Sequence, residues 1–282
     1  MCRLLGWATR DPATLLEVIG QEALSRFTAL ACLHSHGWGI AWRQAGHGVC
    51  HVKETRAADR SPVFLEIATT LRTTAAIMHL RLASSGLAVS AVNTHPFVAD
   101  GVAFAHNGYI PDSVGLLGLL PDHETARLEG ETDSERYFAV LRNRAHGRFH
   151  PAGIQAGIAE VTRTANPLSL NSLLLTEGRL FGIAWHHRPG DPGGEAVAGY
   201  KTPAYYDMSY TYTAESFVVA SGGWQDKGWS QLSNRTGLSF GSDEPDEFST
   251  FKLIDEAGRA AAARPGRQLP GSMPPGTGGD PS

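Results

Sequence analysis

The first residues of the chain place the strongest constraint on its fold, because Met1-Cys2 leads directly into an apolar run at residues 4–8. A short apolar run of this kind predicts a buried strand, and a residue at the start of a buried strand is held rigidly. Removal of Met1 would give Cys2 a free α-amine beside its thiol. An α-amine titrates near ~7.7–8.0 and a cysteine near ~8.5, so this amine can act as the base for the thiol. The alternative is that Cys2 is a small buried hydrophobic residue.

The composition is that of an ordinary globular protein. The 282 residues are 42% hydrophobic and 18% charged, which is enough to bury a full core as one large domain or two small ones. The formal net charge is −4 and Lys and Arg form no cluster, so nucleic acid is not expected as the main partner. No window approaches a membrane span, and charged residues interrupt residues 2–39, so neither membrane insertion nor a secretory signal is expected.

The cysteine content points to a reducing compartment. The chain contains three cysteines, Cys2, Cys32 and Cys50, without a C-x-x-C spacing. This odd number indicates neither a disulfide framework nor a structural zinc site, and we expect a cytoplasmic protein. His79, His95 and His106 lack a recognisable metal-ligand spacing, so we expect no metal ion and no other cofactor.

Apolar patterns and turn residues predict strands and helices in mixed order. Expected strands are residues 4–8, 38–42, 49–53, 75–82, 102–105, 172–175, 180–185, 217–220 and 248–254. Expected helices follow Asp11-Pro12 and cover residues 62–71 and 134–144. The several hairpins favour an α+β protein with antiparallel sheets. Residues 264–282 are rich in Pro and Gly and are expected to form a disordered tail, which leaves residues 2–263 as the domain.

Polar side chains follow the ends of three predicted elements. Arg81 ends an apolar strand and can direct its guanidinium fork at a carboxylate, although a surface salt bridge is the commoner use of an arginine. Asn107 and Gly108 offer a side-chain and a backbone N–H that can form an oxyanion hole, whereas in isolation Asn-Gly more often marks a turn. Asp133, with its neighbours Thr132 and Ser134, either caps the next helix or binds a substrate ammonium.

These pieces form an ordered set of motifs over the first half of the chain. They are Cys2, Arg81, Asn93-Thr94-His95-Pro96-Phe97, His106-Asn107-Gly108 and Glu131-Thr132-Asp133-Ser134. In this order they resemble the class II glutamine amidotransferases, which belong to the N-terminal-nucleophile hydrolase superfamily. The resemblance implies a four-layer αββα sandwich of two antiparallel sheets, with the mature N-terminal cysteine at the end of a central strand.

The resemblance also assigns roles to individual residues. Cys2 would attack the γ-carboxamide carbon of glutamine, and its own α-amine would move the proton. Asn107 and Gly108 would hold the oxyanion. Arg81 would bind the substrate α-carboxylate and Asp133 its α-ammonium. Substrate-binding positions are further implied at Ser84, His95 and Trp38.

The start Met-Cys-Arg-Leu-Leu-Gly and the loop at residues 37–41 look like the short, stand-alone branch of that family, which includes the γ-glutamyl hydrolase of ergothioneine biosynthesis. In that branch Trp38 would pack beside the nucleophile or form part of the pocket lip. His36 stands where the branch usually has aspartate, and Ser84-Ser85 replaces the threonine-containing versions of the large synthases.

We therefore expect an amidohydrolase that cleaves a γ-glutamyl amide and releases glutamate with ammonia or an amine. Its substrate would be glutamine, with an ammonia-accepting synthase subunit as partner, or a γ-glutamyl conjugate. The alternatives are hydrolysis of some other amide and a non-catalytic binding or regulatory protein. A retained Met1 would favour the last of these, because the α-amine of Cys2 would then be an amide.

Overall fold

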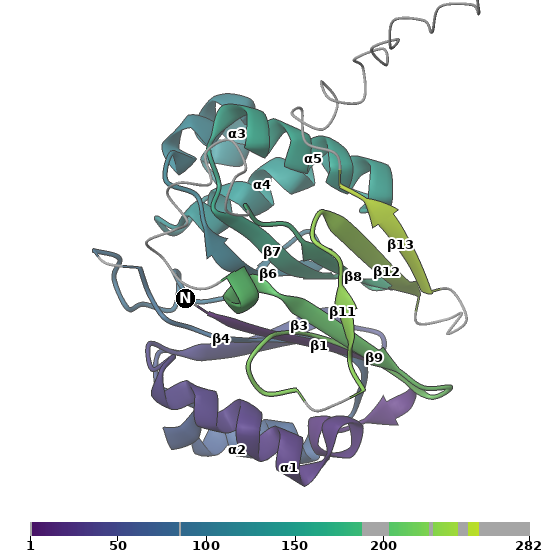
Figure 1. The fold of residues 1–282 in the computed structure, drawn as a ribbon. Coiled ribbons are helices and arrows are strands. Elements are labelled where there is room, and N and C mark those ends of the chain that lie inside the picture. The colour runs from purple at the N-terminus through teal and green to yellow at the C-terminus, as the bar shows by residue number, and fades with distance from the viewer. Residues whose placement is uncertain (1, 85, 188–202, 226–227, 242–247, 254–282) are drawn as a thin grey trace, which may run out of the picture.

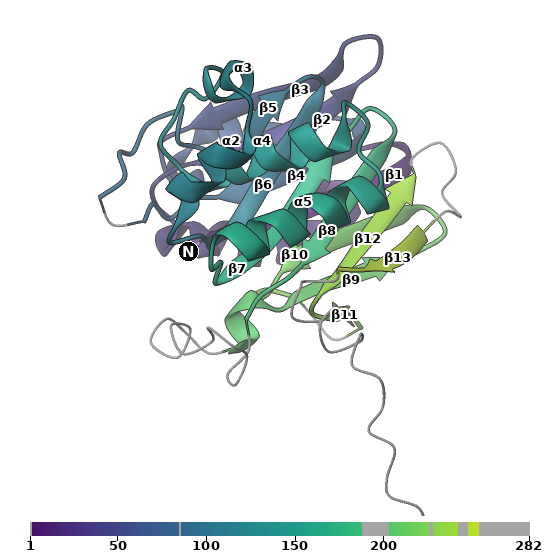
Figure 2. The same ribbon diagram turned by 90° about the horizontal axis from the view of Figure 1, so that it is seen from above.

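Two stacked antiparallel sheets, each covered by helices on its outer face, form the protein (Figure 1). The structure is a computed structural model that describes residues 2–84, 86–187, 203–225, 228–241 and 248–253. The view from above shows the helices α4 and α5 lying across one sheet (Figure 2). The expected α+β class and the four-layer αββα sandwich are therefore confirmed. The expected tail at residues 264–282 lies outside the described residues.

The seven-stranded sheet has the first strand of the chain near its centre. Its spatial order is β11 (Ser230–Leu232), β9 (Met208–Tyr212), β10 (Ser216–Ser221), β1 (Arg3–Ala13), β4 (Thr73–Leu80), β2 (Trp38–Gln44) and β3 (Gly48–Glu54). Helices α1 (Leu15–Ala29) and α2 (Pro62–Thr70) cover its outer face. In β1, Arg3 pairs with Leu80 of β4 and Leu5 pairs with Ala220 of β10, so the chain start is held between two strands.

The six-stranded sheet carries the remaining helices. Its order is β13 (Phe248–Lys252), β12 (Thr236–Gly241), β8 (Arg179–Ala184), β7 (Ser169–Leu175), β6 (Val102–Tyr109) and β5 (Phe97–Ala99). Helices α4 (Asp133–Ala145) and α5 (Pro151–Thr164) pack on its outer face, and α3 (Asp122–Thr125) precedes α4. Short 3-10 helices cover Leu30–Cys32, Ala58–Arg60, Ser113–Leu119 and Pro203–Tyr206.

Strand β1 is buried on both faces, which explains its uninterrupted apolar run. Leu4 and Ala8 face the second sheet, where they join the core between the sheets. Leu5 and Trp7 face α1 and α2 and join the outer core. Because side chains alternate along a strand, Cys2 shares the inner face with Leu4. The strand thus directs the Cys2 thiol toward the space between the two sheets.

One detail of the sequence prediction is wrong, and one alternative is excluded. Asp11 and Pro12 do not start a helix, because β1 continues to Ala13 and Thr14 caps α1 instead. The Thr14 hydroxyl accepts from the Glu17 N–H and the Glu17 carboxylate accepts from the Thr14 N–H, which forms a capping box. The Asn107-Gly108 pair is not a turn, because β6 extends through both residues to Tyr109 and pairs with β7.

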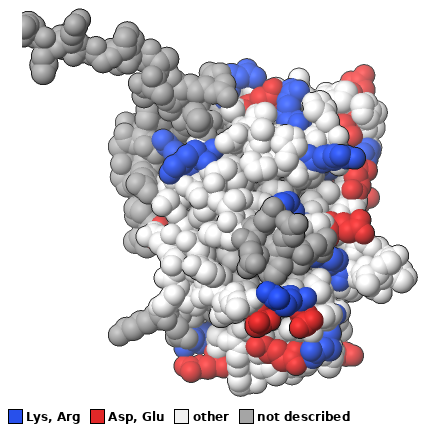
Figure 3. Space-filling model, turned by 90° about the vertical axis from the view of Figure 1, so that its right-hand side faces the viewer, with Lys and Arg blue, Asp and Glu red and all other residues white. Residues whose placement is uncertain are grey.

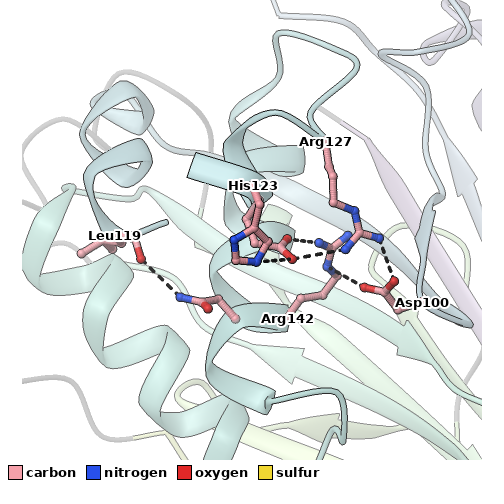
Figure 4. Close-up of polar contacts among 7 residues, drawn as sticks. Asp100, Leu119, His123, Arg127 and Arg142 are labelled. Atoms are coloured by element: carbon pink, nitrogen blue, oxygen red, sulfur yellow. Dashed lines mark hydrogen bonds and ion pairs between the residues drawn. The ribbon is translucent and has the colours of Figure 1, made fainter. Parts of the chain in front are cut away.

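Charged side chains of both signs lie close together on the face shown in Figure 3, mostly toward the helical layers. One set of ion pairs fastens the turn between β5 and β6 to α3 and α4 (Figure 4). Asp100 in this turn pairs with Arg127 at 2.7 Å and lies 3.6 Å from Arg142, which also pairs with Glu124. These contacts fix β6 relative to α4. In the described part of the chain, no helix is both long and apolar enough to cross a membrane.

Candidate active site

A cavity of about 210 Å³ lies where β1 begins and β4 and β6 end. Six of the eight residues expected at the site line it: Cys2, Arg81, Ser84, His95, Gly108 and Asp133. They come from the residue before β1, the segment after β4, the loop before β5, the end of β6 and the start of α4. The remaining two, Asn107 and Trp38, lie outside its lining. The fold therefore gathers into one cavity residues that are far apart in the sequence.

The thiol of Cys2 lies against the backbone of Leu82. The Leu82 N–H points at the sulfur with 3.4 Å between N and Sγ, and Sγ lies 3.7 Å from the Leu82 carbonyl oxygen. Burial raises the pKa of the Cys2 thiol, while the nearby chain terminus, the Leu82 N–H and the Arg81 cation oppose this rise. In the resting protein the sulfur therefore keeps its proton at neutral pH, and its activation requires a base.

Arg81 presents an unsatisfied donor to the cavity. One guanidinium nitrogen, Nη2, donates to the Ala88 carbonyl at 3.0 Å. The other, Nη1, is buried and has no hydrogen-bond partner within the described residues. The residue as a whole is only 3% exposed. A buried cation with an unused donor is suited to a carboxylate, which can compensate the charge and accept the hydrogen bond.

The loop before β2 holds the backbone of this segment in place. The Arg81 N–H donates to the Gly37 carbonyl at 2.8 Å, and the His36 N–H donates to the Arg81 carbonyl at 3.0 Å. The imidazole of His36 accepts from the Ala83 N–H through Nδ1 at 3.0 Å. His36 thus supplies a hydrogen-bond acceptor, as an aspartate would. The replacement of the aspartate usual in the stand-alone branch by His36 is therefore compatible with an ordered loop.

Asn107 and Gly108 lie side by side in β6 at the cavity. Gly108 lines it, and a side chain at this position would collide with the Ser169 carbonyl and the His106 ring. Asn107 is fully buried behind the lining, and neither polar atom of its side chain has a partner within the described residues. A buried amide without hydrogen bonds costs about 1–3 kcal/mol, so its donor is held ready for another acceptor.

Asp133 begins α4 with its carboxylate anchored by backbone donors. Oδ2 accepts from the Ile110 N–H and Oδ1 from the Ser134 N–H, both at 2.8 Å. Thr132, and not Asp133, caps the helix by accepting from the Glu135 N–H. Oδ1 also accepts from the Ser134 hydroxyl at 3.2 Å, whereas Oδ2 has one donor among the described residues, so the fixed carboxylate facing the cavity can still receive an ammonium group through Oδ2.

Three buried histidines lie at or next to the cavity, and two of them, His95 and His106, line it. The His95 and His79 rings lie tilted against each other with centroids 4.2 Å apart, and His106 forms hydrogen bonds with Ser134 Oγ at 2.9 Å and the Ser169 carbonyl at 3.0 Å. Burial lowers the pKa of all three, so they are neutral at pH 7. Both ring nitrogens of His95 lack partners within the described residues. Over this part of the chain, no group of three or more His, Cys, Asp or Glu side chains is placed to hold a metal ion.

The expected place of Trp38 beside the nucleophile is wrong. Trp38 joins the outer core with Phe64 of α2, and its indole N–H donates to Glu54 at 3.1 Å. Its side chain therefore lies on the helix-covered face of the sheet, whereas Cys2 faces the other sheet. Alternation along β2 places Gly39, the neighbour of Trp38, on the inner face. There a side chain would collide with the His95 carbonyl.

Sequence reasoning assigned no role to several residues of the site. Asn93 lines the cavity, donates to the Ala88 carbonyl at 3.4 Å and accepts from the Glu131 N–H at 3.0 Å. Tyr109 also lines the cavity. Arg3 and Tyr205 contact the carbonyl of Cys2. Arg3 carried a detectable signal, since it is a charged residue inside an otherwise apolar strand; Tyr205 did not, since tyrosine is common in cores.

Comparison with known proteins identifies the family of the chain. The family model described as glutamine amidotransferases class-II matches residues 1–187. A Saccharomyces cerevisiae (strain ATCC 204508 / S288c) protein named probable glutamine amidotransferase DUG3 is 26% identical over 160 residues, which are 50% of this chain and 44% of the yeast protein. The chain thus spans less than half the length of that relative.

Solved structures show the same fold at low sequence identity. A glutamine aminotransferase class-II domain protein from Silicibacter pomeroyi has a TM-score of 0.64 and 17% identity, covering 90% of this chain and 100% of its own. The glutamine phosphoribosylpyrophosphate amidotransferase from B. subtilis has a TM-score of 0.58 and 15% identity, covering 90% of this chain and 49% of its own.

Proposed function

Because this chain belongs to the class II glutamine amidotransferases, we propose that it hydrolyses a γ-glutamyl amide through Cys2 once Met1 has been removed. The observation that carries the proposal is the single cavity that Cys2, Arg81, Gly108 and Asp133 line together. It combines a thiol, a carboxylate-binding cation, an oxyanion donor and an ammonium-binding carboxylate. These groups match the two ends and the reactive centre of a γ-glutamyl amide.

The glutamyl end of the substrate fixes the orientation of the substrate in the cavity. The α-carboxylate binds the unused Nη1 donor of Arg81, and the α-ammonium binds the anchored carboxylate of Asp133. Two opposite charges held at fixed positions leave the γ-carbonyl beside the Cys2 sulfur. An apolar acyl group would gain nothing from this pair, so the site favours glutamyl substrates.

The reaction proceeds through a thioester. The α-amine of Cys2 takes the thiol proton as sulfur attacks the γ-carbonyl carbon, and the resulting oxyanion is held by the Gly108 N–H and the Asn107 amide. The tetrahedral intermediate collapses as the ammonium returns its proton to the departing ammonia or amine. Water, activated by the same amine, then attacks the thioester and releases glutamate and the free thiol.

The proposal also includes a partner protein and a cellular compartment. Ammonia released from glutamine would be consumed by a separate synthase subunit. We place the protein in the cytoplasm, because Cys2 must remain a free thiol and Cys32 and Cys50 are also unpaired.

Product analysis tests the proposal. The purified chain is checked by mass for loss of Met1, and glutamate release is measured from glutamine and from γ-glutamyl thioether and amine conjugates, with Cys2→Ala as the control. Release from glutamine that depends on Cys2 supports an ammonia-supplying subunit. Release only from a conjugate identifies a γ-glutamyl conjugate hydrolase, as in ergothioneine biosynthesis. Absence of release from every substrate by the trimmed protein overturns the proposal in favour of a binding protein.

A further inference from the structure

Two side chains outside the cavity lining converge on the carbonyl oxygen of Cys2. Arg3 donates to this oxygen through Nη1 at 3.2 Å, and the Tyr205 hydroxyl donates to it at 3.5 Å. The guanidinium carbon of Arg3 lies 4.1 Å from the centroid of the Tyr205 ring, so the two side chains also hold each other by a cation–π contact. Tyr205 lies in the 3-10 helix Pro203–Tyr206, which is more than 200 positions from Cys2 in the sequence.

The Arg3 cation is buried without a counter-ion among the described residues. Its side chain belongs to a residue that is 8% exposed, and it forms no ion pair with any described carboxylate. Its Nε is also buried without a partner within the described residues. A buried charge without an anion is costly in free energy. The Arg3 cation therefore has its main electrostatic effect on the groups of Cys2 beside it.

The backbone at Gly223 and Ser221 lies beside Arg3. A Cβ at Gly223 would lie 3.5 Å from Nη2 of Arg3, in ordinary van der Waals contact, and Gly223 has a φ of +112°, which favours glycine. On the other side, the Leu4 N–H donates to the buried hydroxyl of Ser221 at 2.9 Å. The Ser221 hydroxyl thus holds the peptide group after Arg3, while Arg3 and Tyr205 hold the carbonyl of the peptide group before it.

The positive charge of Arg3 lies close to the α-amine of Cys2. The nitrogen and carbonyl oxygen of one residue are separated by three covalent bonds, so the Arg3 guanidinium lies within about 7 Å of the Cys2 nitrogen. A like charge at this distance disfavours the ammonium form of an amine. We propose that Arg3, held by Tyr205, is a positioning residue that fixes Cys2 and keeps its α-amine unprotonated and available as a base. This inference rests on the proposed function, in which that amine moves the proton.

The other charged groups facing Cys2 act differently. Arg81 at the end of β4 has the same sign as Arg3, and Asp133 of α4 has the opposite sign. His95 and His106 line the same cavity but are neutral because of burial. Arg81 and Asp133 lie in the cavity, so their replacement changes substrate binding as well as charge. Arg3 does not line the cavity, so its replacement separates the effect on the amine from the effect on substrate binding.

The kinetic test uses the full chain with Met1 removed, verified by mass for every variant. In Arg3→Met, we expect the acid limb of the kcat/KM profile to move to higher pH by about 0.5–2 units, with KM on the plateau changed less than about twofold. In Arg3→Lys, the acid limb should lie between those of the wild type and Arg3→Met. Tyr205→Phe should lower kcat but move the acid limb less than Arg3→Met does. Arg10→Met is the matched control, because Arg10 is an exposed arginine on the same strand. An unchanged acid limb in Arg3→Met overturns the inference.

A second measurement does not depend on turnover. Protein labelled with [15N]cysteine gives one α-amino signal, from Cys2, which is distinct from the amide signals of Cys32 and Cys50. Its titration midpoint should rise by the same amount in Arg3→Met and stay unchanged in Arg10→Met. A raised midpoint in a protein without any turnover would leave the inference standing and overturn the proposed function alone. An unchanged midpoint would overturn the inference whatever the activity.

Discussion

Asn107 and Asn171 face each other across β6 and β7, but among the described residues only the Asn171 side chain has hydrogen-bond partners. Both residues are fully buried. The Asn171 amide donates to the Tyr206 carbonyl at 2.6 Å and accepts from the Trp185 N–H at 2.8 Å. The Asn107 amide has no such partners within the described residues. One member of the pair therefore stabilises the sheet, while the other keeps its donor unused beside the cavity.

Replacement of each asparagine by alanine should separate these roles. Asn107→Ala removes no hydrogen bond, so we expect the free energy of unfolding to change by less than about 1 kcal/mol, while loss of an oxyanion donor lowers kcat by about 10²–10³-fold. Asn171→Ala leaves the Trp185 N–H without its acceptor and should cost about 1–3 kcal/mol. Urea unfolding and glutamate release measure the two effects. Equal loss of stability in both variants would contradict the assignment.

The fold was predictable where patterns are local. The run at residues 4–8 and the hairpin of β7 and β8 follow from apolar runs and turn residues. Helix α5 was not predicted, because Gly153 and Gly157 interrupt its pattern. In the structure Gly157 lies against Leu141 of α4, where a side chain would come within 2.7 Å, so close helix packing explains a glycine that lowers helix propensity.

The site was predictable as a set of residues but not as a geometry. Alternation shows which side chains share a face of a strand, but it does not show which face meets the second sheet, and this is why the placement of Trp38 failed. The Asn107-Gly108 pair continues β6 because β7 provides its pairing partner, Leu170 opposite Gly108. That long-range pairing overrides the local turn preference, and no local signal reveals it.

The three buried histidines should make stability depend on pH. Burial lowers the pKa of His79, His95 and His106 in the folded protein, so the unfolded chain binds protons first as the pH falls. The free energy of unfolding therefore stays at its full value above about pH 6.5. Below that pH it falls by at most about 4 kcal/mol per pH unit for three groups. Urea unfolding between pH 7.5 and 5.5 measures this slope. His95→Gln should make the slope shallower, whereas replacement of the exposed His47 should leave it unchanged.

The ion pairs at the turn between β5 and β6 should contribute unequally to the free energy of unfolding. The Arg142 and Glu124 side chains are 10% and 13% exposed, whereas the Arg127 side chain is 44% exposed. Arg142→Ala leaves the partly buried Glu124 without its closest cation, and we expect a loss of about 2–4 kcal/mol. Arg127→Ala should cost less than about 1 kcal/mol because water and salt screen an exposed pair. Thermal unfolding at low and high salt compares them; equal losses would contradict the difference in burial.

Reactivity of the Cys2 thiol should follow from its burial. Burial raises the pKa of this thiol, and the Arg81 cation is one of the groups that oppose the rise. In a Cys32→Ser, Cys50→Ser background without substrate, alkylation by iodoacetamide should therefore increase with pH to a midpoint above about 8.5, the value of an ordinary cysteine. Arg81→Gln removes a positive charge that favours the thiolate, so its midpoint should move to still higher pH. A midpoint below that of an ordinary cysteine would show that the thiolate already forms in the resting site, and the α-amine would then have no proton to remove.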